Sequence, residues 1–230
     1  MEQTRTSAAD TLSDFADALK AGDTVQLTAL IQQADGQLPR GPRNETLLHS
    51  ATSYLRAENR LALMTVLLDA GLKVDAPDYH GRTPLHTASR ETIDLLLAAG
   101  ADVHARDKAG CIPPHTSMLS DPRLLADGVD ARNRFGLTPL HHAALQPNDA
   151  QVAWLLANGA DPAAQSTAAF RINEDRSDAF KEPLHEFAVG TRPYDMARFR
   201  HDQTKWSSGN YLRVMETLDQ VTPWRGWFFR

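Results

Sequence analysis

The segment from Gly81 to Asp107, GRTPLHTASRETIDLLLAAGADVHARD, constrains this chain more than any other stretch. Thr83 directly precedes Pro84, a pairing that starts a helix because the hydroxyl can cap free amides and proline fits the first turn. An apolar cluster at residues 93–97 predicts a second short helix, which Gly100 ends with a left-handed cap. The segment therefore predicts two short helices followed by a loop that contains a turn.

The same pattern returns along the chain. The sequence FGLTPLHHAA begins at Phe135 and LLANGADPAA begins at Leu155, and looser copies start at Asn44, Cys111 and Thr191. The TPLH start and the GAD ending resemble the ankyrin repeat. That resemblance implies an all-α ankyrin-repeat solenoid of about six helix-turn-helix units joined by hairpin-like loops, in which each unit packs against its neighbours.

The spacing of the copies is irregular. Their equivalent starting positions lie 37, 29, 26 and 54 residues apart, whereas the family period is about 33, and these positions are Thr46, Thr83, Ile112, Thr138 and Arg192. The copy that starts at Thr46 should therefore have helices longer by roughly a turn. The copies that start at Thr83 and Ile112 should have inner helices little longer than a turn. In the last copy Asp195 stands where the histidine would be, and 183–185 offers a competing start. Shortened units are similar to those of bacterial ankyrin proteins.

We expect one domain over residues 1–230. Gly22 followed by Asp23 predicts a cap for the second helix of an N-terminal helix pair. The aromatic end, WRGWFFR, either folds over the last repeat or forms an exposed patch for a partner. The domain divides into an N-terminal cap at 10–43, central repeats at 44–165, an inserted loop at 166–190, and a capping repeat with the aromatic tail at 191–230. An insertion this long is more often functional or disordered than neutral.

Composition narrows the function classes. The net charge of −5 argues against general nucleic-acid binding, and residues 1–163, which are more acidic than basic, would attract a basic partner at long range. Cys111 is the only cysteine, so no internal disulfide can form. The sequence has no apolar core of signal-peptide length and no run long enough to span a membrane. We expect a cytoplasmic monomer without membrane contact.

Nine histidines raise the question of metal or catalytic chemistry. Four of them occupy the repeat's own histidine position, where the resemblance implies hydrogen bonds to the threonine and to the next loop: His49, His86, His115 and His141. The others lack a metal-ligand spacing. Cys111 and His115 could act as nucleophile and base, but no orienting acid is evident. The insertion could supply an acid-base pair, although solvated charge is the simpler interpretation of Glu174, Asp175, Asp178, Glu182 and Glu186. We expect no catalytic residue, cofactor or metal.

The resemblance implies that a partner binds the groove formed by the fingertip loops and the inner helices. Types enriched in binding hot spots occur there, and the candidate partner-binding residues are Tyr54, Tyr79, His80, Arg90, Lys108, Arg134, Phe135, His142 and Gln146. Neither Tyr79 nor Phe135 is required by its turn, and each ring could instead pack on its own hairpin.

We therefore expect a non-catalytic protein-protein interaction module that blocks or positions one partner protein. Its most specific form is a bacterial immunity protein that neutralises a toxin, possible partners being a basic toxin or enzyme. One alternative is a secreted effector that acts on host proteins, and a second is an enzyme that uses the 166–190 insertion.

Overall fold

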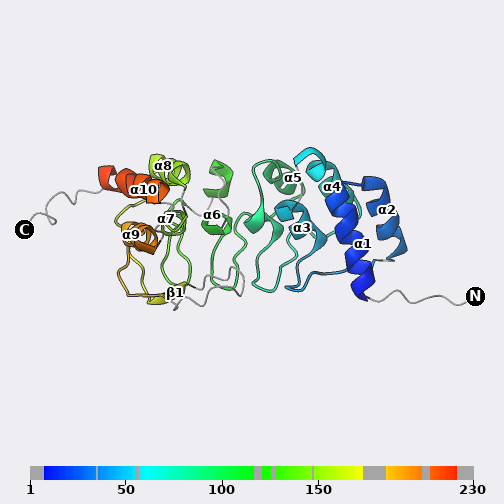
Figure 1. The fold of residues 1–230 in the computed structure, drawn as a ribbon, viewed down its shortest axis with the longest axis horizontal. Helices are drawn as coiled ribbons and strands as arrows, with labels where there is room; N and C mark the ends of the chain where they lie inside the picture. Colours follow the sequence, from blue (N-terminus) through cyan, green and yellow to red (C-terminus); the bar gives the residue numbers. More distant parts are fainter. Residues whose placement is uncertain are drawn as a thin grey trace, which may run out of the picture. The chain divides into compact units, whose positions relative to one another are not determined.

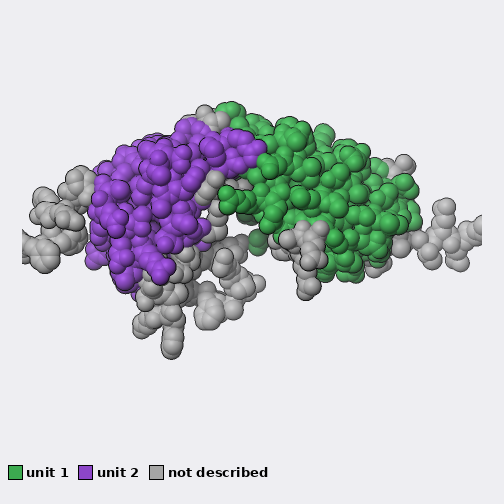
Figure 2. All heavy atoms as spheres, turned by 90° about the horizontal axis from the view of Figure 1, so that it is seen from above, with its two compact units in different colours: residues 1–108 green, residues 109–230 purple. Residues whose placement is uncertain are grey.

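In the computed structural model the chain divides into two compact units, residues 1–108 and 109–230 (Figure 2). The prediction that they form one domain with capped ends stays a prediction. The structure describes residues 8–34, 36–54, 57–116, 121–125, 128–146, 148–172, 185–203 and 208–221.

The first unit contains three helix pairs. Large apolar side chains from every pair form its core, and Phe15, Leu27, Leu48 and Leu96 among them are fully buried. The helix α2 packs on α4 and α4 packs on α5, while α3 packs against η1 (Figure 1). The elements are α1 (Ala8–Ala21), α2 (Thr24–Gln33), α3 (Leu47–Tyr54), α4 (Ala57–Asp69), the 3-10 helix η1 (Pro84–Thr87) and α5 (Ile93–Ala98).

The second unit also contains three helix pairs, together with a short antiparallel ribbon. The helix α7 packs against both α6 and α9, and α8 packs against α10 (Figure 1). The elements are α6 (Pro113–Thr116), the 3-10 helix η2 (Pro122–Leu125), α7 (Pro139–Ala144), α8 (Asp149–Ala157), β1 (Phe170–Ile172), β2 (His185–Phe187), α9 (Pro193–Gln203) and α10 (Ser208–Val221). The six predicted helix pairs are therefore confirmed across the two units, and the ribbon is the element that the sequence did not predict.

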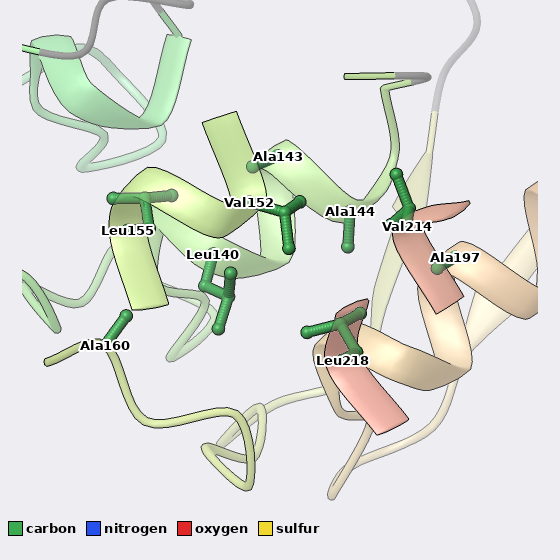
Figure 3. Packing of buried hydrophobic residues seen from close by; sticks show 9 residues of the cluster. All are labelled: Leu140, Ala143, Ala144, Val152, Leu155, Ala160, Ala197, Val214 and Leu218. Atoms are coloured by element: carbon green, nitrogen blue, oxygen red, sulfur yellow. The ribbon is translucent and has the colours of Figure 1, made fainter. Parts of the chain in front are cut away.

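The main core of the second unit lies between its last two helix pairs. Small alanines let the helices approach, and leucine and valine fill the space between them. Figure 3 shows these side chains directed into a shared interior, and the buried members are Leu140, Ala143, Ala144, Val152, Leu155, Ala160, Ala197, Val214 and Leu218.

Repeat spacing correctly predicts helix length. The first helices of the two short copies, η1 and α6, have four residues each, whereas α4 in the long copy has 13 and its counterpart α8 has nine. The predicted N-terminal pair is also confirmed. Asp23 caps α2, because its Oδ1 accepts hydrogen bonds from the amides of Val25 at 3.0 Å and Gln26 at 2.9 Å.

The last helix pair begins at the start that we preferred. The Arg192 amide donates a hydrogen bond to Asp195 Oδ2 at 2.9 Å. The equivalent bond in the preceding repeat runs from the Thr138 amide to His141 Nδ1, at 3.1 Å. A carboxylate thus replaces the imidazole as acceptor for the first turn. The competing start at 183–185 is wrong, because His185 lies on β2 and pairs with Ile172.

Replacing Asp195 by alanine is expected to lower the free energy of unfolding by about 1 kcal/mol, the usual cost of losing a helix cap. Urea unfolding followed by tryptophan fluorescence would measure it. Asp202, exposed on the same helix with its side chain 63% accessible, gives the matched control. Asp202→Ala should change stability by less than about 0.5 kcal/mol, and equal losses in both variants would contradict the capping role.

Candidate partner-binding site

Buried histidines fix the loops of this protein. The Thr138 amide can only donate, so His141 Nδ1 must accept its hydrogen bond and His141 Nε2 carries the proton donated to the Thr191 carbonyl at 3.1 Å. In the first unit, His49 makes the same pair of bonds to the Thr46 amide at 3.2 Å and to the Arg82 carbonyl at 2.8 Å. The predicted structural role of these histidines is confirmed at both positions.

Burial keeps these rings neutral. Loss of hydration lowers the pKa of His141 to about 4, although its bond to the Thr191 carbonyl acts in the opposite direction. Burial also lowers the pKa of His49 below its ordinary value. At neutral pH each ring therefore acts as a fixed, uncharged link between one helix start and the next loop.

Backbone hydrogen bonds tie neighbouring fingertips together within each unit. In the first unit, the Tyr79 amide donates to the Arg43 carbonyl at 2.7 Å and the Lys108 amide donates to the His80 carbonyl at 2.9 Å. In the second, the amide of Arg134 bonds in the same way to the Ala109 carbonyl at 3.0 Å. Side chains at these tips are consequently held at fixed spacing, which lowers the entropy lost when a partner binds.

Tyr79 and Lys108 form an exposed aromatic and cationic surface on two of these tips. The Tyr79 side chain is 64% exposed, and Lys108 Nζ lies 4.3 Å from the centre of its ring. The His80 ring meets Tyr79 edge-on, with centroids 5.4 Å apart. Within the described ranges no carboxylate forms an ion pair with Lys108. Three of the predicted binding residues are thus brought together.

The loop beneath this surface is stiffened by Asp78. Its buried carboxylate accepts hydrogen bonds from the amides of His80 and Arg82, each at 2.8 Å. It also forms an ion pair with Arg82 Nη2 at 2.8 Å. Burial acts to raise the pKa of Asp78, but these bonds, chiefly those with Arg82, outweigh it and leave the pKa below its ordinary value. Tyr79 therefore projects from a rigid turn.

Phe135, the other tip aromatic, lies in a different environment. Its half-buried ring contacts Phe170 of β1, with centroids 6.2 Å apart, and Phe170 stacks on Phe187 of β2 at 5.0 Å. Phe187 in turn meets Phe199 of α9 edge-on at 5.2 Å. Phe135 thus packs against a cluster that includes Leu137 of its own loop and Phe170 of the insertion, and much of its surface is already covered.

The insertion is an enlarged fingertip. In an ordinary tip the Asn133 amide donates to the Leu137 carbonyl and the Gly136 amide to the Asn133 carbonyl, both at 3.0 Å. At the insertion the Ser166 amide donates to the Thr191 carbonyl at 2.9 Å and the Gly190 amide to the Ser166 carbonyl at 3.0 Å. In the chain, residues 167–190 therefore occupy the position of 134–136 in an ordinary tip, and the described part of the insertion pairs as the ribbon β1–β2.

Some residues named in the sequence predictions lie outside the described part of the chain. Glu174, Asp175, Asp178 and Glu182 are outside the described residues, as are the aromatic tail and the side chain of Tyr54. Glu186 is on β2 and is exposed.

His142 lies among internal polar groups. Its Nε2 is 3.4 Å from Asn133 Nδ2 and 3.9 Å from Cys111 Sγ, and its ring meets that of His115 edge-on at 5.2 Å. Burial, with the nearby His115 and His141, lowers the pKa of His142 to about 3. The His142 ring is neutral and half-buried, so a partner that contacted it would meet an uncharged ring.

A Cys111–His115 pair does not form. Both ring nitrogens of His115 are used, Nδ1 by the Ile112 amide at 3.3 Å and Nε2 by the Leu137 carbonyl at 3.0 Å. The histidine beside the buried thiol is His142, a neighbour that the linear spacing did not indicate because it comes from the following repeat. The remaining predicted binding residues, Arg90, Arg134 and Gln146, are all exposed.

Across the described ranges no three His, Cys, Asp or Glu side chains are grouped as metal ligands. Among these same residues no helix combines the length and the apolar character needed to cross a membrane.

Comparison with known families agrees with this geometry. The model for ankyrin repeats in three copies matches residues 15–107, and the model for a single ankyrin repeat matches residues 135–167. The chain belongs to the ankyrin repeat family. Ankyrin repeats indicate a protein-protein interaction module.

A solved structure supports the ankyrin fold over most of the chain. The crystal structure of EF0377, an ankyrin repeat protein, is similar to this chain with a TM-score of 0.53 and 17% sequence identity. The match covers 91% of this chain and 98% of that one. At this identity the likeness concerns the fold alone.

Proposed function

We propose that this ankyrin repeat protein binds one partner protein through its fingertips and inner helices, and that it blocks or positions the partner without catalysis. The observation that carries this proposal is the exposed Tyr79 ring with Lys108 above it, held on tips that the backbone ties together. An aromatic ring fixed in this way can bury a large area at little entropic cost, as binding hot spots do.

The more specific proposal is an immunity protein that acts as a monomer in the cytoplasm and neutralises a bacterial toxin. The net charge of −5 supports it, because an acidic inhibitor attracts a basic toxin or enzyme before contact. Co-expression of the chain with products of neighbouring genes would test this role. Rescue of growth from a toxic product is the expected result, and absence of any rescue would remove the immunity role while leaving partner binding intact.

Replacement of Tyr79 by alanine is expected to weaken partner binding at least tenfold, since the ring would supply a central contact. The partner would be captured from native lysate on the tagged chain, identified, purified and titrated by calorimetry. Lys108→Glu should weaken binding comparably, and more strongly at low salt than at high salt.

Val25 provides the matched control, because it is 79% exposed but lies on α2, away from the tips. The variant Val25→Ala should bind as the unaltered chain does. Full affinity in Tyr79→Ala and Lys108→Glu together would place the contact elsewhere and contradict the fingertip site.

A further inference from the structure

We infer that a hollow in the first unit is a second docking site, for a peptide segment in which an apolar side chain adjoins a carboxylate. The hollow lies between the end of α2 with its following loop, the start of α3, and the turn after α4. It has a volume of about 480 Å³, within the range of roughly 300 to 1,000 Å³ that is usual for ligand sites.

Aliphatic side chains form part of the lining of this hollow, beside polar groups. Leu47 is buried with 3% exposure and, together with Ala76 at 7%, provides packed apolar surface. Ile31, Leu38 and Leu72 add half-buried aliphatic surface. An apolar side chain that entered would replace water on several sides, the condition under which burial is most favourable.

Two cations, Arg40 and Lys73, are also among the lining residues, and both residues are exposed. Arg40 Nη1 donates to the carbonyls of Asn44 at 3.1 Å and Pro77 at 3.3 Å, which holds the guanidinium in place. The lining includes no aspartate or glutamate, and among the described residues neither cation forms an ion pair with a carboxylate. A ligand with a carboxylate would supply the missing opposite charge.

Arg40 also has a structural task. In the second unit Arg132 Nη1 makes the same kind of bridge, to the carbonyls of Gly136 at 2.9 Å and Gln165 at 2.8 Å. A loss of binding in an Arg40 variant could therefore reflect a displaced loop. Among the described residues the Lys73 side chain forms no hydrogen bond or ion pair, so Lys73 is the cleaner position to alter.

The site shares no residue with the predicted partner-binding set. A lining that combines aliphatic side chains with cations favours a ligand that carries both an apolar group and a carboxylate. A peptide that ends in leucine with a free carboxylate has this arrangement. Such a segment could belong to the same partner or to a different protein, and its recognition does not depend on the fingertip proposal.

The probe for the test is an acetylated tripeptide of alanine and two leucines with a free C-terminal carboxylate, titrated into the full-length, ¹⁵N-labelled chain. We expect amide shifts confined to residues 31, 36–40, 46–47 and 70–76, with saturable binding. The same tripeptide with a C-terminal amide should bind at least fivefold more weakly, and Lys73→Gln should weaken binding of the acid at least threefold. Lys20→Gln, on α1, is the matched control and should leave binding unchanged.

Equal affinity for the acid and the amide, or shifts outside the hollow, would overturn the inference. Tighter binding of octanoate than of the tripeptide would assign the hollow to free apolar acids and would also overturn it. A variant that fills the space, Ala70→Trp, should abolish the shifts, while Tyr79→Ala should leave them unchanged. This last comparison separates failure of the hollow from failure of the fingertip site.

Discussion

Acidification from about pH 7.5 to about pH 4 is expected to lower the free energy of unfolding of the second unit by about 3 kcal/mol through His141 alone. Burial lowers the pKa of His141 to about 4 from an ordinary value of 6.5. Between these two values the unfolded chain binds a proton that the folded chain excludes. Stability therefore falls as the pH drops through 6.5 and levels off once the pH is below 4.

The tryptophans make this effect measurable in one unit. All four lie within residues 109–230, at positions 154, 206, 224 and 227, so their fluorescence during urea unfolding reports the second unit. The urea midpoint should decrease steadily from pH 7 to pH 4. His142, with a pKa of about 3, adds to the loss in the same direction.

A variant at the same position supplies the control. His141→Gln removes the titrating ring, so this variant should be less stable at neutral pH but should show a flatter dependence between pH 7 and pH 4. Asp78 does not confuse the result, because it lies in the first unit, and its depressed pKa lowers stability mainly as the pH falls through its ordinary 3.8 and below. An unaltered chain whose urea midpoint is constant from pH 7 to pH 4 would contradict a buried, neutral His141.

Replacement of Leu140 by alanine is expected to destabilise the second unit by about 3 kcal/mol. Leu140 is fully buried between two helix pairs, where it shares its cluster with Val214 and Leu218 of α10 (Figure 3). The helices on both sides are tied by further contacts, so they cannot collapse into the cavity. Urea unfolding followed by tryptophan fluorescence would again measure the loss.

Leu212 gives the matched comparison for this core position. It lies on α10, but its side chain is 46% exposed. Leu212→Ala removes the same atoms from a solvated site and should cost less than about 1 kcal/mol. Similar losses in the two variants would show that the helix pairs are not closely packed around Leu140.

Much of the fold could be predicted because its signals are local. The Thr-Pro starts, the apolar spacing and the capping residues lie within a few positions of the helices that they specify, as Asp23 does for α2. Even the exceptional Asp195 could be placed, because a carboxylate can accept the same amide bond as the usual imidazole. The ribbon β1–β2 gave no such signal, since each of its strands has only three residues.

The candidate site could be predicted only in part. Tyr79 and Lys108 occupy equivalent positions on neighbouring tips, so the repeat pattern alone brings them together. The neighbours of Phe135 and Cys111 could not be predicted in this way. Phe170 comes from an insertion without a counterpart in the other repeats. His142 does not occupy the repeat's own histidine position, which His141 fills. The hollow beside Arg40 and Lys73 depends on how a loop and two helix ends meet, which no motif encodes.

By itself the sequence determined that short helix pairs follow one another, where each begins, and which residues face the tips, because capping and apolar periodicity act over one or two turns. Only the tertiary structure decided that the Tyr79 ring stays exposed whereas the Phe135 ring is partly covered. Exposure depends on which distant segment packs against a side chain. Phe135 lies beside the ribbon that the insertion provides, whereas the Tyr79 ring contacts the side chains of His80 and Lys108 on the tips themselves.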